Sequence, residues 1–243
     1  MYEDLSGQTT VWGDFPKTGE SDPAAHRAFL EKFLAKYMPA IHSYLIRGCG
    51  VRPQDAEDIM HSFLASKVLE GELLSRASKE RGRFRSLLQT SLSHFVSSHK
   101  RKEKAAKRNP GTRTEPIQDA TEPESAQPSP PQIFDVTWAR QLLLQAAGRM
   151  REQCDRAGRK DIWGVFEARI LAGTLNDTAP LDYDALVRLF GFKSPAQASN
   201  VLISGKRMFD RCLRATIAEY EPNDAMIDQE ISSLRRILSG EKR

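Results

Sequence analysis

Cysteine is scarce in this chain, and long apolar runs are missing from it. The three cysteines, Cys49, Cys154 and Cys212, lie far apart and form no C-x-x-C pair, which argues against a disulfide framework or a zinc site. No apolar stretch approaches the roughly 20 residues that span a bilayer, and the amino terminus lacks a basic region followed by an apolar one. We therefore expect reduced cysteines, no secretory signal, no membrane segment and a cytoplasmic location.

Strand-like alternation is also absent, whereas helical periodicity recurs along most of the chain. Hydrophobic residues make up 40% of the sequence and charged residues 28%, values that are ordinary for a folded protein. The length of 243 residues fits two small cores better than one large core, because single domains commonly hold about 100 to 150 residues. The sequence predicts an all-α protein of two small helical domains.

The first part of the chain predicts a leader and one helical domain. Residues 1–21 show no sustained period and indicate a poorly ordered leader. Residues 22–108 predict three helices, of which the first should be kinked or split at Pro39. The second helix should start at Pro53 and the third near Ser86, each with an apolar stripe spaced for burial.

A charge gradient follows the last two of these helices. The second helix has acidic residues in its first turn, where negative charge complements the helix macrodipole. From Arg76 to Arg108 there are eleven Lys or Arg against two acids. This concentration of cations is typical of a protein that binds a phosphate backbone.

A proline-rich segment separates the two predicted domains. Residues 109–132 hold six prolines among Ser, Thr, Gln and acidic residues. This composition predicts a semi-extended, acidic linker, because it cannot bury enough apolar area to fold. Helical pattern resumes with Thr137 as the candidate N-cap, and residues 133–221 predict the second domain.

The second domain contains a candidate helix-turn-helix. Asp182 is placed to cap a short helix, Gly191 to end it, and Ser194 to cap a longer helix. Taken alone this signal is weak, because two helices joined at a glycine also form an ordinary helical hairpin. Residues 222–243 predict a final amphipathic helix.

Three stretches of the chain carry a resemblance to a known family. They are Asp55-Ala-Glu-Asp-Ile-Met-His-Ser-Phe-Leu, then Glu80-Arg-Gly-Arg-Phe-Arg-Ser-Leu-Leu with the basic run that follows, and Tyr183-Asp-Ala-Leu-Val-Arg-Leu-Phe-Gly-Phe-Lys-Ser. Together they resemble bacterial RNA polymerase sigma factors of the extracytoplasmic-function (ECF) group. In that family the first stretch is similar to the polymerase-binding helix, the second to the promoter-melting segment and the third to the start of the second-domain helix-turn-helix. The resemblance covers most of the chain after about Phe15.

The resemblance implies a transcription initiation factor with no catalytic residues and no cofactor. Its first domain would be region-2-like and its second region-4-like. Its partners would be core RNA polymerase, at the beta-prime clamp helices and the beta flap, and promoter DNA, with an anti-sigma factor as a possible further partner.

The resemblance also implies three sets of site residues. The polymerase-binding set comprises Asp55, Glu57, Asp58, His61 and Ser62. The set that would capture the minus-ten strand comprises Arg83, Arg85, Ser93, His94, Ser97, His99, Lys100, Arg101, Lys102, Lys104, Lys107 and Arg108. The set that would read the minus-thirty-five element comprises Lys193, Ser194, Gln197, Ser199, Asn200, Lys206 and Arg207.

The same residues also bear on a metal site, a nucleophilic triad and other modes of DNA binding. Asp58 and His61 have the spacing of a di-iron ligand pair, but no second such pair occurs, so we expect no metal. The serines near His94 and His99 have no third group to orient a base, which argues against a nucleophilic triad. The longer helix that Ser194 should cap is poor in cations where it should contact DNA. Two alternatives therefore stay open: a helix-turn-helix DNA-binding regulator that acts without polymerase, and a sigma-like adaptor with weak DNA binding.

Overall fold

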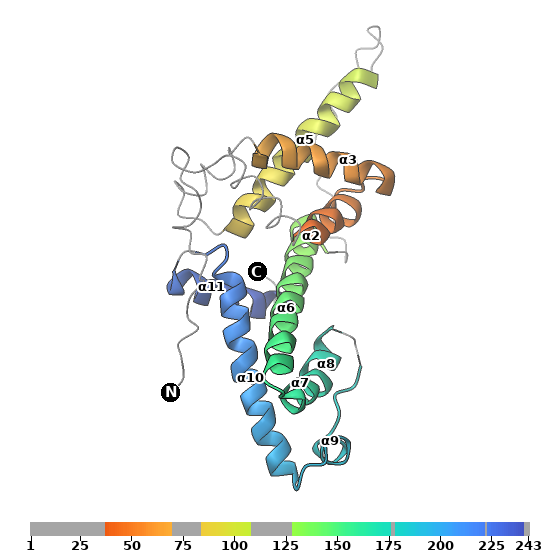
Figure 1. Cartoon of the computed structure of the whole chain (residues 1–243). Coiled ribbons are helices and arrows are strands. Elements are labelled where there is room, and N and C mark those ends of the chain that lie inside the picture. Colours follow the sequence, from red (N-terminus) through yellow and green to blue (C-terminus); the bar gives the residue numbers. More distant parts are fainter. Residues whose placement is uncertain (1–36, 70–83, 108–127, 176–177, 222, 241–243) are drawn as a thin grey trace. The chain divides into compact units, whose positions relative to one another are not determined.

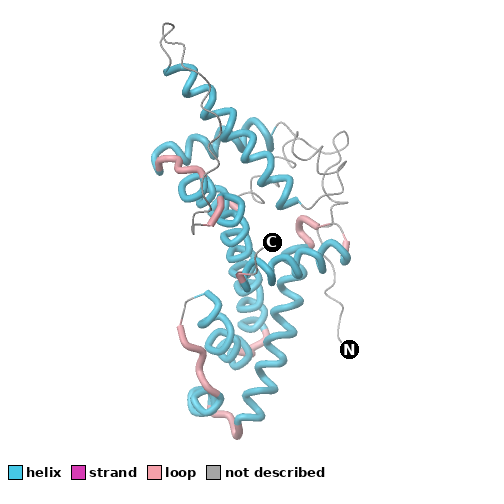
Figure 2. Tube along the Cα trace, turned by 180° about the vertical axis from the view of Figure 1, so that it is seen from behind, coloured by secondary structure: helices cyan, strands magenta, loops and turns pink. Residues whose placement is uncertain are grey.

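The computed structural model describes residues 37–69, 84–107, 128–175, 178–221 and 223–240. These residues are mostly helical and contain no strand (Figures 1 and 2), which confirms the all-α prediction. They fall into two compact units, each described here by itself. The first unit holds the described residues up to Trp138 together with 234–240, and the second holds residues 139–233.

The first unit is built from short helices around one long one. Its helices are α2 (Met38–Ser43), the π-helical η2 (Tyr44–Gly48), α3 (Pro53–Phe63), the π-helical η3 (Leu64–Leu69), α5 (Phe84–Lys107) and the first turns of α6 (Pro130–Arg156). The predicted leader and most of the predicted first helix lie outside the described residues.

Prolines mark the starts of two helices in the first unit, α2 and α3. Pro39 lies in the first turn of α2, and Pro53 opens α3 as the sequence predicted. Both positions suit proline, because the first N–H groups of a helix have no intrahelical acceptor. Between them Gly50 adopts a φ of 65°, which lets the chain turn from η2 into α3.

An aromatic cluster forms much of the core of the first unit. The ring of Trp138 stacks on that of Tyr37 with centroids 4.0 Å apart, and on that of Phe134 at 5.6 Å. Tyr44 meets Phe134 edge-on at 6.1 Å, and Phe84 lies 6.3 Å from Trp138. All five side chains are buried. Since aromatic side chains bury about 150–250 Å² each, this cluster supplies a large share of the apolar burial in the unit.

The helix α6 begins earlier than the sequence predicted. Its N-cap is Ser129, whose backbone N–H donates to the side chain of Gln132 at 2.7 Å, one half of a capping box. Thr137 lies inside the helix and donates its hydroxyl to the carbonyl of Ile133 at 2.9 Å, so the prediction of an N-cap at Thr137 is wrong. The end of the predicted 109–132 linker is therefore helical, and the boundary between compact units falls after Trp138.

The second unit carries the predicted helix-turn-helix. Besides the remainder of α6 it contains α7 (Lys160–Phe166), the π-helical η4 (Glu167–Leu171), α8 (Ala172–Leu175), α9 (Tyr183–Phe190), α10 (Pro195–Ile217) and most of α11 (Asp224–Ser239). Figure 1 shows α9 meeting the start of α10 at a tight turn.

A glycine allows α10 to lie close against α7. A Cβ atom at the buried Gly205 would stand 3.3 Å from the Cβ of Phe166 and 3.5 Å from the carbonyl oxygen of Ile162. Next to this contact, the rings of Phe166 and Phe209 stack with centroids 4.9 Å apart. A glycine inside a helix costs about 1 kcal/mol relative to alanine, and close packing of the two helices offsets that cost here.

Candidate nucleic-acid and partner interfaces

The helix α3 has one apolar face and one acidic face. Its buried residues are Ala56, Ile59, Met60 and Phe63. Glu57, Asp58, His61 and Ser62 are exposed, and by helical periodicity they lie on the other side. All four belong to the predicted polymerase-binding set, and the structure gathers them on one surface, which we call the acidic face.

Asp55, the fifth member of that set, is engaged locally. Its carboxylate pairs with the Nε of Arg52 at 2.6 Å; the side chain of Arg52 is exposed and that of Asp55 is half-buried. The carboxylate raises the pKa of Arg52 by accepting its hydrogen bond. Asp55 stands in the first turn of α3, where it also complements the macrodipole. Its position therefore favours a role in starting the helix.

The helix α5 shares a core with α3 and presents a polar stripe to solvent. Phe63 of α3 meets Phe95 of α5 edge-on with ring centroids 5.5 Å apart. Leu88, Leu92 and Val96 complete the buried side of α5. The polar stripe lies opposite and consists of the exposed residues Thr90, His94, Ser97 and Arg101. Three of these four were predicted as strand-capturing residues, and Thr90 was missed although its spacing of four residues from His94 indicates the same stripe.

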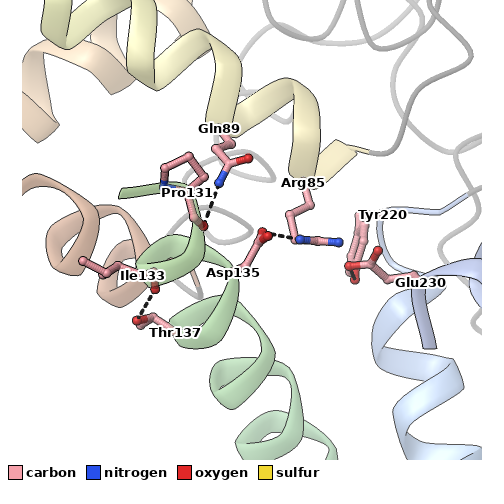
Figure 3. A network of polar contacts seen from close by, with 8 residues as sticks. All are labelled: Arg85, Gln89, Pro131, Ile133, Asp135, Thr137, Tyr220 and Glu230. Carbon is pink, nitrogen blue, oxygen red and sulfur yellow. Dashed lines mark hydrogen bonds and ion pairs between the residues drawn. The ribbon is translucent and has the colours of Figure 1, made fainter. Parts of the chain in front are cut away.

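Arg85 does not lie on the exposed basic surface where the sequence placed it. Its side chain is 7% exposed and forms an ion pair with Asp135 of α6. One turn further along α5, the side chain of Gln89 donates to the carbonyl of Pro131 at 3.0 Å. Figure 3 shows Arg85 and Gln89 reaching from α5 toward the first turns of α6. Arg85 thus joins two helices within the first unit, and this contact requires a correction to the predicted strand-binding set.

Three other members of that set make contacts within the first unit. Lys100 donates its ammonium to the carbonyl of Cys49 at 2.5 Å, at the end of η2. Ser93 hydrogen-bonds the hydroxyl of Tyr44, although burial has the larger effect and raises the pKa of that tyrosine. The ring of His99 lies over Phe95 at 6.5 Å. These contacts orient the side chains and leave Lys100 exposed.

Of the other cations in the predicted strand-capturing set, two are exposed and four lie wholly or partly outside the residues that the structure describes. Arg101 and Lys102 are exposed near the end of α5. Lys104 and Lys107 belong to α5, but their side chains lie outside the described part of the structure, as do the whole of Arg83 and Arg108.

The helix-turn-helix has the caps and the turn that the sequence predicted. Asp182 accepts a hydrogen bond from the backbone N–H of Ala185 at 2.7 Å, and Gly191 ends α9 with a φ of 68°. Ser194 caps α10 by accepting from the N–H of Gln197 at 3.3 Å. The side chain of Gln197 in turn accepts from the N–H of Lys193 at 2.8 Å. Ser194 and Gln197, both predicted to read DNA, therefore stabilise the start of α10.

The outward stripe of α10 differs from the predicted reading set. Its core side includes Ala198, Leu202, Gly205 and Cys212. The exposed residues diametrically opposite are Ala196, Asn200, Ile203 and Arg207, which define the outward stripe. Asn200 and Arg207 were predicted, whereas Ala196 and Ile203 were missed because a search for polar residues passes over them. Lys206 is exposed and Ser199 half-buried on one flank of the stripe, and Lys193 is exposed before the helix begins.

All three cysteines are free, and two of them, Cys154 and Cys212, are buried. Burial raises the pKa of the Cys154 and Cys212 thiols, and Cys154 lies with its sulfur 3.5 Å from that of Met208. Within the described ranges, no three His, Cys, Asp or Glu side chains gather as metal ligands. None of the described helices is long and apolar enough to cross a bilayer.

No family model, no curated protein and no solved structure matches the chain.

Proposed function

We propose that this protein is a sigma-type transcription initiation factor that binds core RNA polymerase and directs it to promoters. The observation that carries the proposal is the chemical difference between α3 and α5, which share one core and turn different faces to solvent. An acidic face suits a basic surface on a protein partner. A stripe of hydroxyl, imidazole and guanidinium groups suits an unpaired nucleic-acid strand.

In this proposal each unit has its own target. Glu57, Asp58 and His61 contact the beta-prime clamp helices, and the polar stripe of α5 holds the non-template strand of the minus-ten element. The second unit is region-4-like and approaches the minus-thirty-five element and the beta flap. The protein acts in the cytoplasm without a catalytic residue or a cofactor, and an anti-sigma factor is a possible further partner.

The first experiment measures binding to core polymerase. In co-purification, wild-type protein should retain the core enzyme. The double charge reversal Glu57→Lys with Asp58→Lys should weaken binding at least roughly tenfold, because like charges that face each other across an interface cost several kcal/mol. The matched control reverses two exposed acids of α6, Glu152→Lys with Asp155→Lys, and makes the same change in net charge. Equal loss in both double variants would show that net charge, and not the acidic face, governs binding.

The second experiment measures function. Protein and core polymerase together should give promoter-dependent run-off transcripts from genomic promoters. A protein that neither binds core polymerase nor supports transcripts from several such promoters is not a sigma factor.

A helix-turn-helix regulator that acts without polymerase is the second candidate. It is favoured by the capped start of α10 and the left-handed turn at Gly191, which are internal to the second unit. This candidate predicts specific duplex binding that the double reversal at Glu57 and Asp58 leaves unchanged. A sigma-like adaptor is favoured instead by the use of Ser194 and Gln197 in capping. The adaptor predicts core binding without promoter opening.

A further inference from the structure

The outward stripe of α10 contains more apolar surface than phosphate contact requires. Ile203 stands at its centre with 45% of its surface exposed, so a branched aliphatic group meets solvent beside a charged residue of the same stripe. Ala196 and Asn200 precede it and Arg207 follows it. The stripe therefore combines a methyl group, an amide, a branched aliphatic group and a guanidinium in line along one helix face.

This combination matches one class of base pair. In the major groove an asparagine side chain can bond both the N6 and N7 atoms of adenine, and small apolar side chains contact the methyl group of thymine. We propose that the outward stripe of α10 reads A·T base pairs in the major groove of duplex DNA. Asn200 bonds adenine, and Ala196 and Ile203 contact thymine methyl groups. The inference rests on the proposed DNA-binding role of the second unit and specifies the sequence class that this unit reads.

The position of the stripe fits this role. In a helix-turn-helix, the first turns of the second helix contact base edges while the first helix crosses the backbone. Ala196, Asn200 and Ile203 all lie near the start of α10, within the turns that would enter the groove. The Ser194 and Gln197 hydrogen bonds hold those turns helical, so the order of the three side chains along the groove is fixed.

The charge around the stripe favours DNA over a protein partner. Between residues 183 and 211 the cations are Arg188, Lys193, Lys206, Arg207 and Arg211, and the acids are Asp184 and Asp210. All seven are exposed. An apolar stripe with an excess of cations on its flanks matches a duplex, whose methyl groups lie in the groove between two phosphate backbones.

Selection from a library of duplexes tests the inference. Full-length protein, with and without core polymerase, is mixed with duplexes randomised over a short window, and the bound sequences are determined. Wild-type protein should enrich A·T-rich windows. Asn200→Ala should lower the preference for adenine at one position by roughly 5- to 150-fold, the discrimination of one bidentate contact. Ile203→Ala should lower the preference for thymine at a neighbouring position by a smaller factor.

Lys206→Gln is the matched control, because Lys206 is exposed on the flank of the same helix. Loss of one phosphate contact should weaken all duplexes about equally and lower the slope of log affinity against log salt by about 0.9. The order of preferred sequences should stay that of the wild type. The inference would be overturned if Lys206→Gln changed the base preference as much as Asn200→Ala does.

The remaining outcomes separate this inference from the sigma proposal. Three outcomes would overturn the A·T assignment: no enrichment of any sequence, enrichment of G·C-rich windows, or the same enrichment by wild type and by Asn200→Ala. If Ile203→Ala weakens core polymerase binding and leaves the enriched sequences unchanged, the stripe is a protein-binding face and the assignment falls. If A·T windows are enriched but core polymerase does not bind, the assignment stands and the sigma proposal fails.

Discussion

The two long helices α5 and α10 have similar lengths, 24 and 23 residues, but present different chemistry to solvent. Thr90, His94, Ser97 and Arg101 face outward from α5, whereas Asn200 and Ile203 occupy the centre of the stripe on α10. Hydroxyl and imidazole groups can bond bases and phosphates in many orientations, which suits an unpaired strand. An amide next to aliphatic groups needs the fixed geometry of a duplex groove. In the proposals made above, these two amphipathic helices bind two forms of DNA, an unpaired strand at α5 and a duplex at α10.

The two helices are also anchored by opposite means. Large side chains hold α5, through the aromatic cluster around Trp138 and the Arg85–Asp135 ion pair. The absence of a side chain lets α10 approach α7 at Gly205. Truncation should therefore damage the anchoring of α5, and enlargement should damage that of α10.

The largest effect is expected for Trp138→Ala. Removal of a fully buried ring that stacks on Tyr37 and Phe134 should lower the free energy of unfolding by about 3–5 kcal/mol. Urea unfolding followed by far-ultraviolet circular dichroism measures the change. Trp163→Ala is the control, because Trp163 is only partly buried and should cost less. Equal losses for the two variants would contradict the anchoring role of the cluster.

The next effect concerns the ion pair. Asp135→Ala leaves the guanidinium of Arg85 buried with one carboxylate fewer, and should cost about 1.5–3 kcal/mol, the range for hydrogen bonds to charged groups. The double variant Arg85→Met with Asp135→Leu should recover much of that loss, because an apolar pair removes the buried charge. A double variant that loses as much stability as Arg85→Met and Asp135→Leu, measured singly, lose in sum would show that the residues act independently.

A pair of glycine substitutions tests the anchoring of α10. Gly205→Ala should lower the free energy of unfolding by about 1 kcal/mol, since the new methyl group crowds the buried Phe166. Gly148→Ala in α6 should raise it by about 0.5–1 kcal/mol, because nothing lies within 4 Å of its Cβ position and alanine favours the helix. Chemical unfolding compares the two variants directly. Stabilisation by both would mean that α7 and α10 can separate without cost.

The smallest effect is a pH dependence in α7, the helix against which α10 packs. Hydrogen bonds from Arg159 at 2.9 and 3.0 Å lower the pKa of Asp161. The pair therefore stabilises the fold at pH values above the unfolded-state pKa of the carboxyl group. This contribution disappears as the pH falls through the folded-state pKa. Asp161→Asn should cost about 0.2–1 kcal/mol near neutral pH, the range for exposed pairs. In acid the difference between variant and wild type should vanish; a constant difference would assign the effect to packing.

Helix ends were predictable where the signal was local. Pro53, Asp182, Gly191 and Ser194 act within one or two turns of their own positions, and the structure has each where the sequence predicted it. The start of α6 was mispredicted, although Ser129 and Gln132 carry a capping-box pattern. The proline-rich composition before it favoured a linker, and the local capping signal was overlooked.

For the site residues, the sequence predicted exposure correctly where exposure follows helical periodicity. Glu57, Asp58 and His94 are exposed because they lie opposite apolar stripes that the sequence itself displays. The exposed Ile203 was missed, because only polar residues of this helix were taken as candidates, although periodicity places position 203 outward. A strict use of periodicity would have found it.

By itself the sequence determined that the chain forms helices, where α3, α9 and α10 begin, and which residues on α3 face away from a core. These features depend on neighbours within a few turns. Only the tertiary structure decided the role of Arg85, whose partner Asp135 lies 50 positions along the chain. It likewise decided the role of Gly205, which permits close packing against Ile162 and Phe166 of another helix. Contacts between distant segments depend on how helices pack, and packing is set by shapes that a one-dimensional pattern does not contain.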